Sequence, residues 1–132
     1  MKQTIAIIGS RTFNNYSLLE KRLSSYIVAN NIDATIVSGG AKGADTLGIE
    51  YAKDNNLKWH IHKADWKNIS HPDARIKQNQ YGEYDANAGH RRNQLIIDDC
   101  DVVIAFTNGS SGTADSLKKA KAAGKETIVV NF

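Results

Sequence analysis

The chain has 132 residues, of which 41% are hydrophobic and 23% are charged, and its formal net charge at pH 7 is +3. This length fits one domain spanning residues 1–132, and the composition excludes a largely disordered chain. The modest positive charge contains no run of basic residues that could follow a duplex, so it favours a small anionic ligand over nucleic acid.

Short apolar runs rich in β-branched residues predict buried parallel strands over residues 4–9, 34–39, 57–62, 101–106 and 127–132. Apolar side chains at helical spacing between these runs predict helices over 17–30, 44–55, from 88 onward and 114–123. Alternating strands and helices need right-handed crossovers. We therefore expect an α/β fold: a single Rossmann-like, doubly wound parallel sheet with strand order 3-2-1-4-5 and helices on both faces.

In such a sheet the strand order reverses between strands 1 and 4, and ligands bind in the crevice at the carboxyl ends of the strands there. No apolar run reaches the ~18 residues of a membrane span. The first apolar run is also too short for a signal peptide, so we expect a cytoplasmic protein without membrane contacts.

The long connection at about 63–88 interrupts the regular alternation and contains three aromatic residues of interest, Trp66, Tyr81 and Tyr84. Connections of this length are often functional, so one hypothesis is a lid whose aromatic rings stack on a base. The alternative is a surface excursion whose aromatic residues form a small separate core. We also expect a short helix within 73–80.

The first strand ends in Gly9, Ser10, Arg11, Thr12 and Phe13, at the expected crevice. Backbone amides and hydroxyl groups there can approach an anion, and Arg11 can bind it with two hydrogen bonds. Phe13 is a further candidate for stacking on a base. The alternative for Arg11 is an ion pair with a surface carboxylate.

Two glycine-rich loops follow strands and lead into helices. Their candidate phosphate-binding residues are Ser38, Gly39, Gly40, Lys42, Gly43 and Asp45 in one loop, and Asn108, Gly109, Ser110, Ser111, Gly112 and Thr113 in the other. Glycine lets several N–H groups point at one phosphate, and the helix N-terminus adds partial positive charge. The alternative for either loop is a tight strand-to-helix turn without a ligand.

A third candidate element is the helix that opens with Arg91, Arg92 and Asn93. Basic residues at a helix N-terminus oppose the helix dipole, and a bound anion would explain their placement. The alternative is a pair of solvated arginines.

Several specific sites are excluded. Neither glycine-rich loop continues into the Gly-Lys-Ser/Thr of a P-loop, and Gly9 does not begin the G-x-G-x-x-G of a classical dinucleotide site. His60 and His62 share a strand face without a complete metal-ligand set nearby. We therefore expect no metal and no cofactor.

Together the segments GSRTF, SGGAKGAD, AGHRRN and NGSSGT resemble the SLOG superfamily, and most closely its YspA-like branch. The resemblance covers nearly the whole chain and implies a small Rossmann-like protein of the kind common in bacteria and phages. It implies binding of a nucleotide, such as a signalling nucleotide or a derivative of NAD or ADP-ribose.

The same superfamily contains the LOG phosphoribohydrolases and DprA, which imply two alternatives. In a LOG-like N-glycosidic hydrolase, Asp45 or Asp115 would be catalytic while Arg11 and Arg92 hold phosphate. However, Ser116 stands where the LOG family has its catalytic Glu, and Asp115 is one residue early. DprA-like DNA binding is disfavoured by the modest charge, and the LOG resemblance also implies a homodimer.

Overall fold

The computed structural model describes residues 2–67, 69–72, 74–80 and 82–132. The strands are β1 (Lys2–Gly9), β2 (Asp33–Ser38), β3 (Lys58–Ile61), β4 (Ile76–Asn79), β5 (Gly82–Asp85), β6 (Val102–Thr107) and β7 (Glu126–Asn131). The helices are α1 (Tyr16–Ala29), α2 (Ala44–Asp54), α3 (Ala88–Asp98) and α4 (Ser111–Ala122). None of these helices combines the length and the apolar character that crossing a membrane requires.

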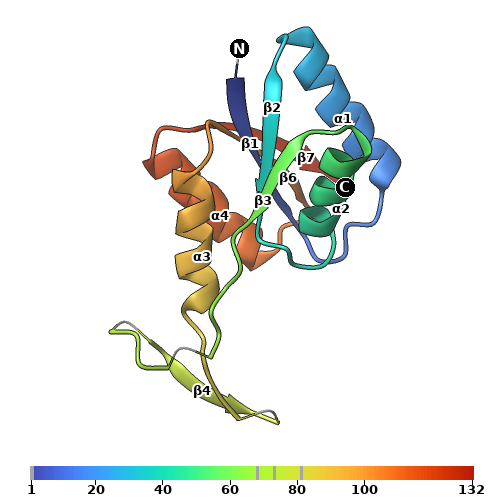
Figure 1. The fold of residues 1–132 in the computed structure, drawn as a ribbon. Coiled ribbons are helices and arrows are strands. Elements are labelled where there is room, and N and C mark those ends of the chain that lie inside the picture. The colour runs from blue at the N-terminus through green and yellow to red at the C-terminus, as the bar shows by residue number, and fades with distance from the viewer. Residues whose placement is uncertain (1, 68, 73, 81) are drawn as a thin grey trace.

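The main sheet is parallel and has the order β3-β2-β1-β6-β7 (Figure 1). Central strand β1 pairs with both neighbours, so that Ile5 lies opposite Ile36 of β2 and Val102 of β6. Strands β4 and β5 form a separate sheet, so β6 and β7 are the fourth and fifth strands of the main one. The predicted fold class and the predicted strand order 3-2-1-4-5 are therefore confirmed.

Both faces of the sheet are covered by helices, which explains why its strands read as continuous apolar runs. Successive side chains of β1 alternate between the two faces: Ile5 and Ile7 belong to the core beneath α1 and α2, and Ala6 and Ile8 to the core beneath α3 and α4. Figure 1 shows the two helix pairs on opposite sides of the sheet. This arrangement leaves the carboxyl ends of β1, β2 and β6 on one edge, where the site lies.

The long connection between β3 and α3 forms an antiparallel hairpin of β4 and β5, in which Ile76 pairs with Asp85. The expectation of a short helix within 73–80 is wrong over Ile76–Asn79, because these residues pair across the hairpin instead of bonding along a helix. The hairpin projects away from the main sheet, beyond the N-terminal end of α3 (Figure 1).

A buried carboxylate fixes the base of the hairpin to α3. Asp85 is fully buried, and its Oδ1 accepts hydrogen bonds of 2.9 Å from the backbone amides of Arg75 and Asn87. Its Oδ2 accepts a hydrogen bond from the guanidinium of Arg91, on the first turn of α3. Burial opposes ionisation of Asp85, but these hydrogen bonds outweigh it and lower the pKa of the carboxyl.

Candidate functional site

A cavity of about 380 Å³ lies at the carboxyl ends of β1 and β6, in the crevice predicted for the ligand. Its lining comes from four parts of the chain that are distant in sequence. The lining residues are Ile8, Gly9, Ser10, Arg11, Ala41, Asp45, Arg92, Asn93, Ile96, Ser110, Ser111, Gly112, Thr113 and Ser116. We call it the first cavity.

The loop after β1 is held in place by its own backbone and by the entry to α2. Ser10 donates its amide hydrogen to the carbonyl of Phe106 at 2.9 Å, and its carbonyl accepts from the amide of Ala44 at 3.3 Å. Gly43 has a φ of +83°, and a Cβ there would lie 2.2 Å from the carbonyl oxygen of Ser10. Glycine is therefore required at position 43 so that α2 can begin against this loop.

Asp45 stands in the first turn of α2 and organises the preceding loop from within. Its side chain is only 7% exposed, and its Oδ2 accepts hydrogen bonds from the amides of Gly39 (3.1 Å) and Ala41 (3.3 Å). Burial raises the pKa of Asp45 to about 6, although Arg92, the two amides and Arg11 all favour the ionised form. The first cavity therefore contains a carboxyl group that can change protonation state near neutral pH.

Arg92, from the first turn of α3, reaches across the crevice to the loop after β2. Its Nη1 donates to the carbonyl of Gly39 at 2.9 Å, and its Nε donates to Oδ1 of Asn93 at 3.0 Å. A Cβ at position 39 would lie 2.3 Å from Nη1, so only glycine leaves room for this guanidinium. Burial lowers the pKa of Arg92, Asp45 opposes that change, and Arg11 adds to it.

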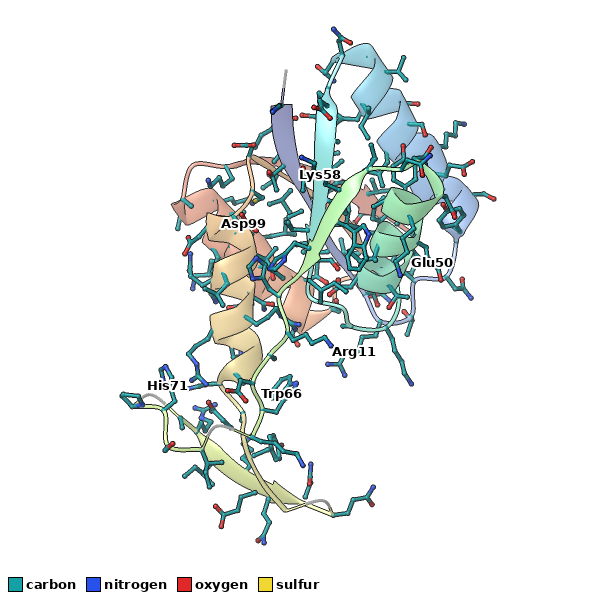
Figure 2. The ribbon with its side chains drawn as sticks, viewed as in Figure 1. Arg11, Glu50, Lys58, Trp66, His71 and Asp99 are labelled. Atoms are coloured by element: carbon teal, nitrogen blue, oxygen red, sulfur yellow. The ribbon has the colours of Figure 1, made fainter. Side chains whose placement is uncertain are left out.

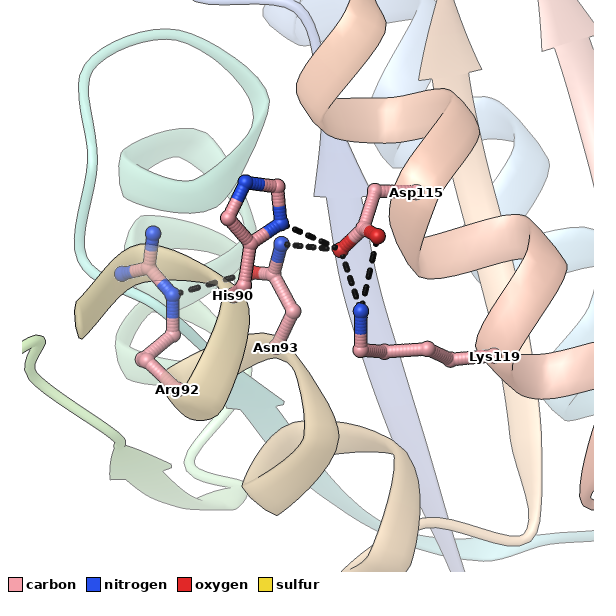
Figure 3. A network of polar contacts seen from close by, with 5 residues as sticks. All are labelled: His90, Arg92, Asn93, Asp115 and Lys119. Carbon is pink, nitrogen blue, oxygen red and sulfur yellow. Dashed lines mark hydrogen bonds and ion pairs between the residues drawn. The ribbon is translucent and has the colours of Figure 1, made fainter. Parts of the chain in front are cut away.

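The second acidic candidate, Asp115, belongs to a polar network between α3 and α4 that reaches Arg92 through Asn93 (Figure 3). Both of its carboxylate oxygens accept hydrogen bonds of 2.7 Å from Lys119, and Oδ2 also lies 3.2 Å from Asn93 Nδ2 and from His90 Nδ1. Burial opposes ionisation of Asp115, but these partners outweigh it and lower its pKa. Asp115 lines neither cavity described here.

The helices differ in whether a side chain caps their N-terminus. The N-terminus of α1 is capped by Asn15, whose Oδ1 accepts from the amide of Leu18 at 3.0 Å. The N-cap residues of α2 and α4, Gly43 and Ser110, provide no side-chain hydrogen bond to their helices. Ser110 instead donates its hydroxyl to Thr113 Oγ1 at 2.9 Å. The first amides of α4 can therefore bind an external acceptor.

A second cavity, of about 410 Å³, adjoins the first. It is lined by Arg11, Gly39, Gly40, Ala41, Lys42, Lys63, Ala64, Trp66 and Arg92. The two cavities share Arg11, Ala41 and Arg92. Figure 2 shows Arg11 and Trp66 on the side of the molecule where the sheet meets the hairpin.

Most of the predicted ligand-binding residues line one or both cavities. The first cavity brings together Gly9, Ser10, Arg11, Asp45, Arg92, Asn93, Ser110, Ser111, Gly112 and Thr113. The second adds Gly39, Gly40, Lys42 and Trp66. The predicted phosphate-binding residues that line neither cavity are Thr12, Ser38, Gly43, Arg91, Asn108 and Gly109, and the catalytic candidate Asp115 also lines neither.

Some of these residues support the site from behind. The Ser38 hydroxyl donates to the carbonyl of Asp45 at 3.1 Å, and Thr12 Oγ1 lies 2.9 Å from Ser10 Oγ. Asn108 Nδ2 donates to the same Thr12 oxygen at 3.3 Å. The Asn108 contact joins the loop after β6 to the loop after β1, and the Ser38 contact holds the end of β2 against the start of α2.

Phe13 does not serve as an exposed stacking surface. It is 1% exposed, and its ring packs 4.9 Å from the rings of both Phe106 and Phe132. The structure therefore places Phe13 in the core, because the chain turns inward directly after the Arg11 turn. Tyr84 packs edge-on against Trp66 at 6.5 Å and lines neither cavity, while Tyr81 lies outside the described residues.

The predicted lid contributes only its first part to the site. Lys63, Ala64 and Trp66 line the second cavity, but no described residue of β4 or β5 lines either cavity. Lys63 was not identified from the sequence. Lys63 lies two residues beyond the end of β3, and β3 ends at the same sheet edge as β2. This position in the sequence could have indicated that Lys63 lies near the site. Ala41 and Ile96 were also missed, as small or apolar wall residues carry no chemical signature.

The described residues contain no group of three or more His, Cys, Asp or Glu side chains that could hold a metal ion. His62 Nε2 instead lies 2.9 Å from Asp99 Oδ2, and the rings of His60 and His62 contact each other at 4.5 Å.

Comparison with known families decides the relationship. The model of the YspA, cpYpsA-related SLOG family (YAcAr) matches residues 3–69, about half of the chain. The chain belongs to this family. The match includes β1, β2 and β3, with the loops that carry Arg11 and Asp45, and confirms the resemblance drawn from the motifs. The α3 arginines and the loop after β6 lie beyond the matched residues.

Among individual proteins, the YAcAr chain is similar to the Gene 61 protein of Mycobacterium phage D29. The two are 27% identical over 135 residues, which cover 97% of this chain and 94% of the phage protein. A phage homologue therefore exists at nearly the same length.

Solved structures with the same fold include DNA processing protein A (DprA). The Helicobacter pylori protein, described in a single-stranded DNA binding mode, gives a TM-score of 0.68 at 24% identity, covering 96% of this chain and 64% of that chain. The Streptococcus pneumoniae protein gives 0.70 at 22% identity, covering 97% and 50%. This chain thus spans about half to two thirds of those proteins.

A molybdenum cofactor binding protein from Rippkaea orientalis gives a TM-score of 0.65 at 20% identity, covering all of this chain and 78% of that chain. At such identities these three likenesses show the fold alone.

Proposed function

We propose that this YAcAr protein binds a nucleotide or a nucleotide-derived phosphate ligand in the first cavity. The observation that carries the proposal is the position of Arg92, which is partly buried and lines the first cavity together with Arg11 and the start of α4, a helix without a side-chain N-cap. A phosphate between these groups would accept hydrogen bonds from both guanidinium groups and from helix amides.

The charge of the cavity supports an anionic ligand. Arg11 and Arg92 are the lining cations, and Asp45 is the lining carboxylate. Asp45 Oδ2 is already engaged by the amides of Gly39 and Ala41, so it only partly balances the arginines. Because burying a guanidinium is costly without a counter-charge, a phosphate would complete the electrostatics of the site.

The rest of the lining fits the sugar and the base. Asn93, Ser110 and Ser111 offer amide and hydroxyl groups for a ribose, while Ile8 and Ile96 provide apolar wall. The cavity volume of about 380 Å³ lies within the usual range of small-molecule sites. Membership of a SLOG family favours nucleotide-derived ligands, including signalling nucleotides and derivatives of NAD or ADP-ribose.

A thermal-shift panel tests this proposal. Adenine and guanine nucleotides and ADP-ribose are each added at millimolar concentration, and a ligand bound only by the folded state should raise the melting temperature. Native mass spectrometry of the freshly purified protein would reveal a ligand that co-purifies. A short single-stranded DNA is also added to the protein in the thermal-shift panel. Stabilisation by DNA with none by the nucleotides would replace this proposal with DNA binding.

A second candidate function, N-glycosidic hydrolysis of a nucleoside monophosphate, is favoured by one observation. Asp45 lines the first cavity, and its carboxyl has a pKa of about 6. In its ionised form it could stabilise positive charge on the ribose or activate water. Water would then attack the anomeric carbon, the bond to the base would break, and the base would leave with a proton.

Chromatography of AMP or GMP after long incubation with the protein separates binding from hydrolysis. Free base and ribose 5-phosphate in stoichiometric amounts would establish the hydrolase. Asp45→Asn should then lose turnover while retaining binding. Asp115→Asn is the matched comparison, because Asp115 lines neither cavity. Intact nucleotide throughout would leave the protein as a binder.

A further inference from the structure

Arg11 and Arg92 stand at the boundary between two adjoining cavities, and only the first is needed to bind a nucleoside monophosphate. We propose that the second cavity is an additional anion site, which receives the distal phosphate of a nucleoside diphosphate or of its esters. The inference rests on the proposed function, because it assumes that the first phosphate lies between the two arginines.

The described residues that line the second cavity have charges of one sign. Four of them are cationic, Arg11, Lys42, Lys63 and Arg92, and none of them is a carboxylate. Asp45 lines only the first cavity. Asp65 is next to Ala64 in sequence but is absent from the lining. Ordinary surfaces mix charges of both signs, so a lining with four cationic residues favours an anion with more charge than one phosphate.

The topology explains why these cations meet. Lys42 belongs to the loop after β2, and Lys63 follows β3, which pairs with β2 in parallel. Both strands therefore end at the same sheet edge, next to the Arg11 turn after β1. A phosphate chain that starts between Arg11 and Arg92 would extend from the centre of the sheet toward β3, with the lysines along its path.

Trp66 supplies a surface for a group beyond the second phosphate. It lines the second cavity and is 39% exposed. A Cβ at Gly89 would lie 2.9 Å from its Cη2, so the indole packs directly on the start of α3. Its carbonyl also accepts a hydrogen bond from the amide of Asp85 at 2.6 Å. A preorganised indole can stack on a ribose or a base and report binding by its fluorescence.

The test compares the affinities of AMP, ADP and ADP-ribose, with GMP and GDP in parallel, measured by calorimetry in EDTA. One or two new charge-assisted hydrogen bonds should make the diphosphates bind roughly tenfold or more tightly than the monophosphates. In the double variant Lys42→Ala, Lys63→Ala this preference should fall to about twofold or less, while the affinity for the monophosphate is retained. Lys67→Ala, an exposed lysine of the same connection outside both linings, is the matched control.

The outcomes separate the two proposals. If AMP or GMP binds but the diphosphate binds no more tightly, or if the double variant keeps the preference, the second cavity is not an anion site while the proposed function stands. If no nucleotide binds, both proposals fail. Trp66→Phe should weaken ADP-ribose binding more than ADP binding, and equal effects would exclude stacking beyond the second phosphate.

Discussion

The two glycine-rich loops share the pattern Gly-x-x-Gly and both lead into helices, yet they use their glycines differently. In the loop after β2, side-chain atoms at Gly39, Gly40 and Gly43 would collide with the protein itself. In the loop after β6, a Cβ at Gly109 or Gly112 would meet no described atom within 4 Å. The first loop is a packed wall, and the second faces open space that a ligand can occupy.

Their backbone amides differ in the same way. Gly39 and Ala41 donate their amide hydrogens to Asp45, so these two amides of the first loop already have hydrogen-bond acceptors within the protein. The N-terminus of α4 receives no side-chain cap from Ser110. One sequence pattern therefore builds a support for Arg92 in one place and the anion-binding surface that we propose in another, and the difference lies in what packs around each glycine.

The largest effect should come from Gly43→Ala, which tests whether the first loop is a packed wall. The substitution combines a left-handed backbone with a Cβ 2.2 Å from the Ser10 carbonyl. We expect a loss of about 3 to 4 kcal/mol in the free energy of unfolding, measured in urea. Gly124→Ala, also at positive φ but in open space, should lose only about 1 kcal/mol. Equal losses would show that the contact with Ser10 is unimportant.

The protonation of Asp45 should make stability depend on pH. Its pKa is raised from 3.8 to about 6 in the folded protein. Between these values the folded state holds a proton that the unfolded state releases, so stability falls as pH rises from about 4 to about 6. The full change is about 3 kcal/mol, at about 1.4 kcal/mol for each tenfold change in proton affinity.

Asp45→Asn provides the comparison, because it keeps an acceptor for the loop amides and removes the titration. Relative to wild type, this variant should gain stability across that pH window in urea titrations. The lowered pKa values of Asp85 and Asp115 act below about pH 4 and are common to both proteins. A constant difference between the two proteins from pH 4 to 7 would contradict the raised pKa.

Ligand affinity should depend on Arg92, which the first loop supports through the carbonyl of Gly39, and on Arg11. Arg92→Ala and Arg11→Ala should each weaken nucleotide binding by roughly 1.5 to 3 kcal/mol in calorimetry, the range for hydrogen bonds to charged groups. Both variants should remain folded. Arg22→Ala, at an exposed position of α1, changes the net charge equally and should bind as wild type does. Unchanged affinity in both site variants would remove the arginines from the site.

The smallest effect, but one with opposite signs in two measurements, is expected for Gly112→Ala in the second loop. Gly112 is in the first turn of α4, so alanine should stabilise the protein by about 0.5 to 1 kcal/mol. The new methyl group would point into the space assigned to the ligand, and affinity should fall severalfold. Higher stability with unchanged affinity would mean that the ligand does not approach this turn.

The sequence was sufficient to predict the sheet, its strand order and the edge at which the two cavities lie. Short β-branched runs alternating with amphipathic segments allow few topologies, and the crossover rule reduces them further. Gly39 and Arg92 could each be selected from local chemistry. That a glycine at 39 makes room for the guanidinium of Arg92 could not be predicted, because 53 positions separate them.

Neighbouring residues with the same chemistry were separated only by tertiary packing. Arg91 and Arg92 are adjacent, but successive helical positions point in different directions. Arg91 therefore pairs with the buried Asp85 of the hairpin, and Arg92 contacts Gly39. Likewise Asp45 lines the first cavity, whereas Asp115 is held by Lys119, Asn93 and His90.

The sequence by itself thus determined the α/β architecture and the position of the crevice, because hydrophobic periodicity and glycine-rich turns act over short stretches of chain. Tertiary structure alone decided which charged and aromatic side chains face the crevice. It buried Phe13 against Phe106 and Phe132, and directed β4 and β5 away from the site. The direction of a side chain depends on contacts with residues that are distant in sequence, and a local sequence pattern does not predict these contacts.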